Sequence, residues 1–193
     1  MIKGQGGGNM LILASSSPRR AKLLSDLGLD FIVEPSHIDE DQVDSKLKPT
    51  ELAIELAKQK ALLVAKNHPE DIVIGADTIV VHENTILGKP KDEEDAYRML
   101  KSLSADRHVV YTAVALVKGE KAYTFITEAE VSMKPLSDLE IHNYIKTGEP
   151  MDKAGAYGIQ GDGGNLVDHY KGDFFTIVGL PLKDLMEALK NFQ

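Results

Sequence analysis

The chain has 193 residues and a formal net charge of −8, with 22 Lys and Arg against 30 Asp and Glu. Because Cys is absent, a disulfide framework, a thiolate zinc site and a cysteine nucleophile are excluded, and a reducing, cytoplasmic location is expected. The negative balance argues against a general nucleic-acid or membrane-surface binder, and no apolar run approaches the ~20 residues of a membrane helix. A small anionic ligand stays compatible with this charge, because a local cluster of Lys and Arg can oppose it.

The predicted elements, taken in chain order, alternate in the manner of an α/β protein. We expect residues 1–9 to be a cloning remnant, Met10 to be the native start, and residues 10–193 to form a single domain. Hydrophobic periodicity predicts strands at 10–14, 31–33 and 72–81, and helices at 18–27 and 50–67. Further along, a helix opens at 92–95, a hairpin turns at 118–121, a capping box opens a helix at 137, and Pro181 starts the last helix. A Gly-rich segment at 155–164 and a second hairpin with its turn at 171–173 complete the pattern.

The first predicted helix begins with an unfavourable charge pattern. Ser17 suits the N-cap and Pro18 the first helical position. Arg19 and Arg20 follow in the first turn, where the helix dipole disfavours cations. Two interpretations are open: two solvated arginines, or an anion site in which helix N–H groups, serine hydroxyls and guanidinium groups converge on phosphate oxygens.

A lysine falls on the apolar side of the second predicted helix. At about 100° per residue, Lys60 lies inside an apolar stripe, between Leu52, Leu63 and Leu56 on one side and Ala53 and Val64 on the other. Its side chain either extends past the stripe to water, or its ammonium group faces an anion in the interior, because an unpaired buried charge is costly.

Asp77 interrupts the apolar strand predicted at 72–81. A carboxylate there requires a partner, so it is either half of a structural salt bridge, or a metal ligand or general base. Gly75 and Ala76 beside it leave room for a ligand. After a turn at 83–84, Lys89 is expected beside Asp77 on the returning strand.

These positions together supply four cations, Arg19, Arg20, Lys60 and Lys89, and two acids, Asp77 and Glu40. Such a set suits metal-assisted chemistry on a polyphosphate, with cations on the phosphates and carboxylates on Mg²⁺ or Mn²⁺, so a nucleotide or sugar phosphate is indicated. The sequence contains no GxxxxGK[ST], no GxSxG and, beyond residues 1–9, no GxGxxG. P-loop and α/β-hydrolase chemistry are therefore excluded.

Five motifs in order resemble those of the Maf family of nucleoside triphosphate pyrophosphatases, long labelled septum-formation inhibitors. They are LASSSPRR at 13–20, AKQKA at 57–61, GADT at 75–78, GKP at 88–90 and DKAGAYGIQG at 152–161. The resemblance runs from Met10 to about residue 192. It implies a fold like that of the inosine triphosphate pyrophosphatases, with two lobes around a cleft and an elongated mixed sheet flanked by helices, and a homodimer.

The resemblance also implies a reaction: a nucleoside triphosphate and water give the monophosphate and pyrophosphate, with a divalent cation. Asp77 matches the proton acceptor of the family, and it would share the metal with Glu40. Three residues match positions tied to substrate choice, namely Arg19, Thr78 and Gln160. Five match positions that bind phosphate, namely Ser15, Arg19, Arg20, Lys60 and Lys89. The GADT and GIQG segments resemble the subgroup that acts on dTTP, UTP and related pyrimidine nucleotides.

Two alternatives stay open. One is a nucleotide-binding regulator of cell division with an unknown division partner, in which hydrolysis is incidental. The other is a pyrophosphatase for 7-methyl-GTP or ITP.

Overall fold

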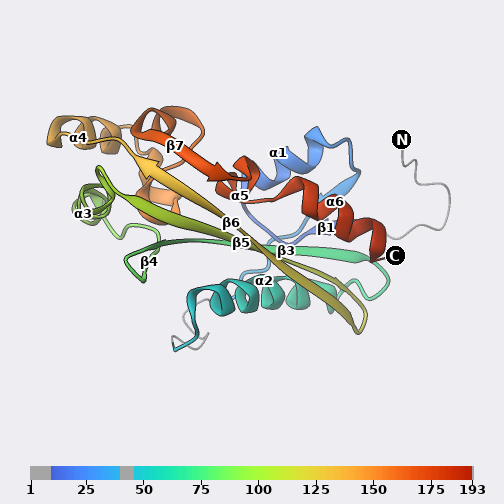
Figure 1. Cartoon of the computed structure of the whole chain (residues 1–193). Helices are drawn as coiled ribbons and strands as arrows, with labels where there is room; N and C mark the ends of the chain where they lie inside the picture. Colours follow the sequence, from blue (N-terminus) through green and yellow to red (C-terminus); the bar gives the residue numbers. More distant parts are fainter. Residues whose placement is uncertain (1–9, 40–45, 193) are drawn as a thin grey trace. The chain divides into compact units, whose positions relative to one another are not determined.

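The sequence folds into a mixed sheet flanked by helices, as the alternating pattern predicts (Figure 1). The computed structural model describes residues 10–39 and 46–192; residues 1–9 and Glu40 therefore lie outside the described part. The strands are β1 (Leu11–Leu13), β2 (Phe31–Val33), β3 (Ile72–His82), β4 (Thr85–Leu87), β5 (Arg107–Lys118), β6 (Lys121–Met133) and β7 (Val167–Gly172). The helices are α1 (Pro18–Asp26), α2 (Pro49–Ala65), α3 (Glu93–Leu103), α4 (Asp138–Lys146), α5 (Phe174–Val178) and α6 (Leu182–Asn191), with short 3-10 helices η2 (Glu149–Asp152), η3 (Ala154–Ala156) and η4 (Gly161–Leu166).

The strand order is β2-β1-β3-β5-β6-β7, and β4 pairs antiparallel with the last residues of β3, from Val80 to His82. β1 is parallel to both of its neighbours, with Leu13 opposite Val33 on one side and Ile74 on the other. Because β1 is followed in sequence by β2 on one side and later by β3 on the other, the chain reverses its winding direction at β1. In α/β sheets such a reversal opens a ligand site at the carboxyl ends of the two strands.

The described residues divide into two compact units. The first unit lies within Met1–Asp77, Ala113–Phe125 and Leu182–Gln193, and the second within Thr78–Thr112 and Ile126–Pro181. β3, β5 and β6 each continue from one unit into the other, and the boundary on β3 falls between Asp77 and Thr78.

In the first unit, α2 lies on one side of β1 and β3, and α1 and α6 lie on the other (Figure 1). The buried side of α2 is formed by small residues, among them Ala57 and Ala61. Gly75 of β3 faces them so closely that a Cβ there would overlap the carbonyl group of Ala57. The sequence interpretation was wrong at two points: Gly75 makes room for a helix and not for a ligand, and Leu63 is exposed.

The second unit has its own apolar core between the sheet and the pair α3 and α4. The buried members of this core include Leu100, Leu103, Val131, Ile141 and Tyr157. The predicted helix starts are confirmed: Asp92 caps α3 by accepting a hydrogen bond from the Asp95 amide at 2.8 Å, and Ser137 and Glu140 form the capping box of α4.

Two predictions about the chain path are wrong. No hairpin turns at 171–173; instead β7 pairs antiparallel with β6, and Asp173 then caps α5 through a 2.9 Å bond from the Thr176 amide. The strand returning from β3 ends at Leu87, so Lys89 lies beyond it in an exposed loop. In the part of the chain described, no helix combines the length and apolar character needed to span a membrane.

Candidate functional site

The candidate site of the first unit lies where β1 and β3 end as parallel neighbours. Ser15 follows β1 after one residue, and Asp77 stands three positions beyond Ile74, the partner of Leu13. This is the carboxyl end of β1 at the reversal point, where the pairing with β1 stops and β3 continues alone to His82, the kind of place where an α/β sheet presents loops and helix N-termini to a ligand. Ser15 and Asp77 are both buried, each with 7% of its surface exposed.

Ser15 organises the start of α1. Its hydroxyl oxygen accepts hydrogen bonds from the Ser17 amide at 3.2 Å and from Nη1 of Arg20 at 3.2 Å. Ser17 caps the helix as predicted, accepting from the Arg20 amide at 3.4 Å. Arg19 and Arg20 are half-buried. Arg20 is therefore held in place by Ser15, which favours the anion-site interpretation over two solvated arginines.

Lys60 and Asp77 form an ion pair at 2.7 Å, with side chains only 13% and 10% exposed. This contact depends on the close approach of α2 to β3 at Gly75, which brings the lysine to the strand. Of the two interpretations of Lys60, an ammonium group facing an interior anion is confirmed. Two charges held out of water require further polar partners to offset their desolvation, so this pair marks a place where polar groups converge.

Thr78, the next residue of β3, belongs to the second unit and begins a chain of hydroxyl groups. Its Oγ1 lies 2.9 Å from Oγ1 of Thr112, and Thr112 donates to the carbonyl oxygen of Thr176 at 2.7 Å. Because the single hydroxyl hydrogen of Thr112 goes to Thr176, Thr78 is the donor in its bond to Thr112. Sequence reasoning missed Thr112 and Thr176, since a threonine in a strand or helix breaks no local rule.

Lys89 and Gln160 lie on exposed parts of two loops in the second unit that are joined by backbone hydrogen bonding. The amide of Gly155 donates to the carbonyl oxygen of Gly88 at 3.1 Å. Gly155 has a φ of 71°, and a Cβ there would press against Val80, so only glycine suits this junction.

The structure thus sorts the predicted site residues into two groups. Those of the first unit are Ser15, Arg19, Arg20, Lys60 and Asp77, and those of the second are Thr78, Lys89 and Gln160. Within the first group, a hydrogen bond joins Arg20 to Ser15 and an ion pair joins Lys60 to Asp77.

The predicted metal ligands are described only in part, because Glu40 lies outside the described residues. Asp77 offers the hard oxygen donors that Mg²⁺ and Mn²⁺ prefer, so the residue that is described fits such an ion. Within 10–39 and 46–192, a separate group with ligand atoms within 4.8 Å of one another consists of His82, Glu83 and Asp106. None of these three was predicted, and His82 already pairs with Asp106 at 2.9 Å.

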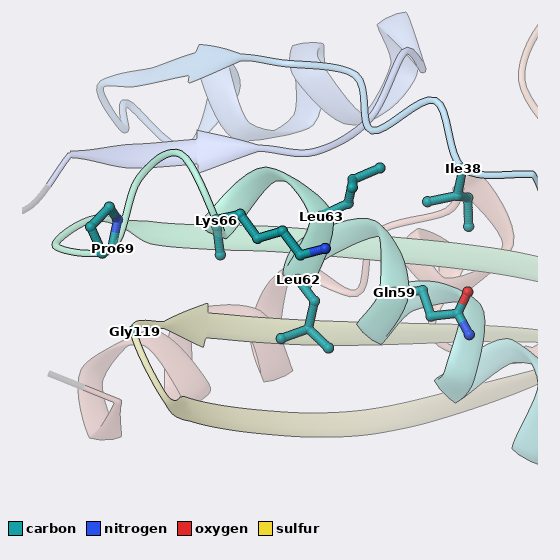
Figure 2. Close-up of a pocket in the computed structure, with 8 residues that line it drawn as sticks. Ile38, Gln59, Leu62, Leu63, Lys66, Pro69 and Gly119 are labelled. Atoms are coloured by element: carbon teal, nitrogen blue, oxygen red, sulfur yellow. The ribbon is translucent and has the colours of Figure 1, made fainter.

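A surface hollow of about 580 Å³ lies against the side of α2 that carries Gln59, Leu62 and Leu63 (Figure 2). It is lined by Ile38, Gln59, Leu62, Leu63, Ala65, Lys66, Pro69 and Gly119. Among the predicted site residues that the structure describes, none lines this hollow, so it gives no evidence about the predicted site.

Comparison with known proteins gives a consistent result over nearly the whole chain. The family model described as "Maf-like protein" matches residues 10–192. The chain is 46% identical to the dTTP/UTP pyrophosphatase of Acholeplasma laidlawii, over 95% of this chain and 96% of that protein. It is 47% identical to the dTTP/UTP pyrophosphatase of Aquifex aeolicus, over 93% of this chain and 94% of that protein. The solved Ham1 protein of Staphylococcus aureus matches with a TM-score of 0.45 and 17% identity, over 65% of this chain and 72% of that one.

Proposed function

We propose, from the premise that this chain belongs to the Maf family, that it hydrolyses dTTP and UTP to the monophosphate and pyrophosphate. Relatives of this activity cover the chain almost end to end. The observation that carries the proposal is the buried Lys60–Asp77 pair, with Asp77 on β3 just past the carboxyl end of its neighbour β1, where the Ser15–Arg20 contact follows. A carboxylate and cations held together there suit water attack on a phosphoanhydride.

The cations bind the triphosphate in this proposal. Arg20 presents its guanidinium from a fixed position, because Ser15 holds one of its nitrogens, and a guanidinium group can engage two phosphate oxygens at once. Arg19 adds a second guanidinium in the same first turn, where the helix N–H groups also favour anions. Lys60 and Lys89 neutralise charge that builds on the departing pyrophosphate.

Asp77 takes the proton of the attacking water. Lys60 sits 2.7 Å from it and keeps its carboxylate in place. Reactions of this class are metal-assisted, and we assign Asp77 and Glu40 as the residues that hold the divalent ion, Mg²⁺ or Mn²⁺. The bound ion supplies charge neutralisation on the phosphates and a more acidic water.

Gln160 and Thr78 select the base. A Gln amide offers both a donor and an acceptor, which suits the O4/N3 edge of thymine and uracil. The hydroxyl group of Thr78 donates its hydrogen to Thr112, and this bond fixes the orientation of the hydroxyl. Related modified pyrimidine nucleotides that keep this edge are substrates in the same proposal.

Pyrophosphate release from a panel of nucleotides tests the activity. The purified chain, supplied with Mg²⁺ or Mn²⁺, is expected to turn over dTTP and UTP in preference to 7-methyl-GTP and ITP. Preference for either purine nucleotide would contradict the substrate assignment. Tight nucleotide binding without turnover would instead support the regulator of cell division. The homodimer implied by the family resemblance stays a prediction, to be checked by sedimentation of the same preparation.

A further inference from the structure

Glu149 of η2 belongs to the second unit and is not one of the predicted site residues, yet its carboxylate is the centre of a hydrogen-bond cluster. Oε1 accepts from the Tyr144 hydroxyl at 2.9 Å and from the Gly163 amide at 3.2 Å, and Oε2 accepts from the Asp162 amide at 3.2 Å. Glu149 is half-buried and Tyr144 is only 4% exposed. One carboxylate thus collects three donors from two separate segments.

The donors flank Gln160 on both sides. Asp162 and Gly163 follow it in η4, and their amides are bound by Glu149 directly. Gly158 precedes it, and its amide donates to the Tyr144 hydroxyl oxygen at 3.2 Å. The Tyr144 hydroxyl therefore accepts from one side of Gln160 and donates to the carboxylate that holds the other side.

Glu149 takes over a role that Gln160 does not perform. Gln160 is the N-cap residue of η4, and its side chain makes no capping hydrogen bond. The first amides of a helix have no partner within the helix and require an acceptor. Because Glu149 supplies that acceptor from the preceding 3-10 helix, the cap leaves the Gln160 amide group for another partner.

The segment around Gln160 is closely packed at its glycines. Gly161 has a φ of 73°, and a Cβ there would lie 2.9 Å from Oε2 of Glu149. A Cβ at Gly163 would overlap the carbonyl group of Gly158. The chain is therefore folded tightly around the carboxylate. Burial raises the pKa of Tyr144, so the hydroxyl keeps the hydrogen that it donates to Glu149.

We infer that Glu149 and Tyr144 are positioning residues for base recognition, which hold the loop so that the Gln160 amide meets the nucleotide base in a fixed orientation. This inference rests on the proposed function, because it needs Gln160 to contact the base. Neither residue touches substrate in this account; both act through the backbone on either side of Gln160.

The main test measures selectivity and not activity alone. Glu149→Gln replaces Oε2 or Oε1 by an NH₂ group, which cannot accept from a backbone amide. We expect the ratio of kcat/KM for dTTP over dCTP to fall about tenfold, the scale of one charge-assisted hydrogen bond. The change should lie in KM for dTTP, with kcat altered less than about twofold. Tyr144→Phe should act in the same direction.

Two matched controls separate positioning from general stability. Glu140→Gln also removes a carboxylate that accepts from an amide and a hydroxyl, at the capping box of α4. Tyr97→Phe also removes a tyrosine–carboxylate bond, to Asp138. Both should lower the thermal midpoint without changing the dTTP/dCTP ratio. If Glu149→Gln behaves as these controls do, with an unchanged ratio, the inference is overturned.

A second readout does not depend on activity. Hydrogen exchange at the amides of Gly158, Asp162 and Gly163 should accelerate in Glu149→Gln and stay unchanged in Glu140→Gln. Unchanged exchange in Glu149→Gln would also overturn the inference. Gln160→Ala separates a failure of the positioning inference from a failure of the proposed base contact. If Gln160→Ala lowers the dTTP/dCTP ratio while Glu149→Gln does not, the positioning role alone is wrong. If Gln160→Ala keeps the ratio, the proposed base contact itself is wrong.

Discussion

The two groups of candidate residues are built from different interactions. In the first unit, a buried ion pair and a serine-held arginine present charge directly. In the second unit, Thr78 and the loop around Gln160 are held by hydroxyl groups, backbone amides and one carboxylate that caps them. The first arrangement suits binding and activating a polyanion, whereas the second suits reading the shape and hydrogen bonds of a base.

The difference predicts different costs of mutation. Removing one member of a buried ion pair leaves the other charge without compensation and costs roughly 3–5 kcal/mol. Removing one neutral hydrogen bond costs about 1 kcal/mol and shifts a loop. Variants of the first unit should therefore lose both stability and rate, and those of the second should lose selectivity.

The largest effect is expected at Asp77. Asp77→Asn should lower pyrophosphate release by at least ~10³-fold, because an amide cannot accept the proton. It should also lower the free energy of unfolding by roughly 3 kcal/mol, because Lys60 loses its carboxylate partner. Steady-state kinetics and urea denaturation measure the two losses.

The double variant Lys60→Met/Asp77→Asn separates these two effects. Replacing a buried pair by uncharged groups is often neutral for stability, so the unfolding free energy should recover while activity stays absent. Recovered activity in the double variant, or substantial residual activity in Asp77→Asn, would mean that the pair is structural and not catalytic.

Gly75 should carry the next largest effect, because it sets the distance between α2 and β3. Gly75→Ala places a Cβ against the Ala57 carbonyl, and we expect about 1–3 kcal/mol of destabilisation. Activity should fall about 10²-fold, since displacement of α2 misplaces Lys60. At Gly88 nothing lies within 4 Å of an added Cβ, so Gly88→Ala should keep its melting temperature. An equal loss in both variants would contradict this explanation.

The candidate residues of the first unit were the more predictable ones from sequence. Asp77 in an apolar strand and Arg19 and Arg20 at a helix start each contradict their local pattern, and charge that does so must have a partner or a function. The sequence pattern also predicted the strand at 72–81 and the hairpin at 118–121, which the structure confirms.

The candidate residues of the second unit were less predictable because they obey local rules. Thr112 is an ordinary strand residue, and Glu149 follows the end of a helix, so neither stands out without the tertiary structure. Only the family motif indicated Gln160. The hairpin at 171–173 was wrong for a related reason: Asp173 caps a five-residue helix, which is too short to have a recognisable hydrophobic period.

The pH dependence of stability tests whether the second unit requires the buried side chain of His108 to be uncharged. Burial, with a smaller contribution from His82, lowers the pKa of His108 from 6.5 to about 4. The ring is 2% exposed, and its Nε2 lies 2.6 Å from the Tyr157 hydroxyl. Between pH 4 and 6.5 the unfolded chain therefore binds the proton and the folded chain does not, so stability rises with pH across this window.

The expected change is about 3 kcal/mol, fully present above pH 6.5 and lost as pH falls towards 4. Urea denaturation at pH 7 and pH 4.5 measures it, with His108→Gln as the comparison, since Gln cannot titrate. Carboxyl groups with a lowered pKa, such as those of Asp106 and Asp138, lose most of their contribution to the free energy of unfolding at pH values below this range. An equally steep pH dependence in His108→Gln would assign it to other groups.

The smallest effect is expected at Thr112, whose hydroxyl links Thr78 to α5. Thr112→Val keeps the shape of a fully buried side chain but removes the acceptor for Thr78 and the donor to Thr176. We expect about 1–2 kcal/mol of destabilisation and a severalfold rise in KM for dTTP, with kcat nearly unchanged. Thr127→Val is the matched control, because Thr127 bonds Oγ1 of Thr176 at 2.7 Å and its replacement leaves the Thr112 hydroxyl, the acceptor for Thr78, in place. Thr127→Val should lose similar stability and keep the parent KM, since the hydroxyl of Thr78 would stay oriented. A raised KM in both variants would show that the position of α5, and not the Thr78 hydroxyl, controls substrate binding.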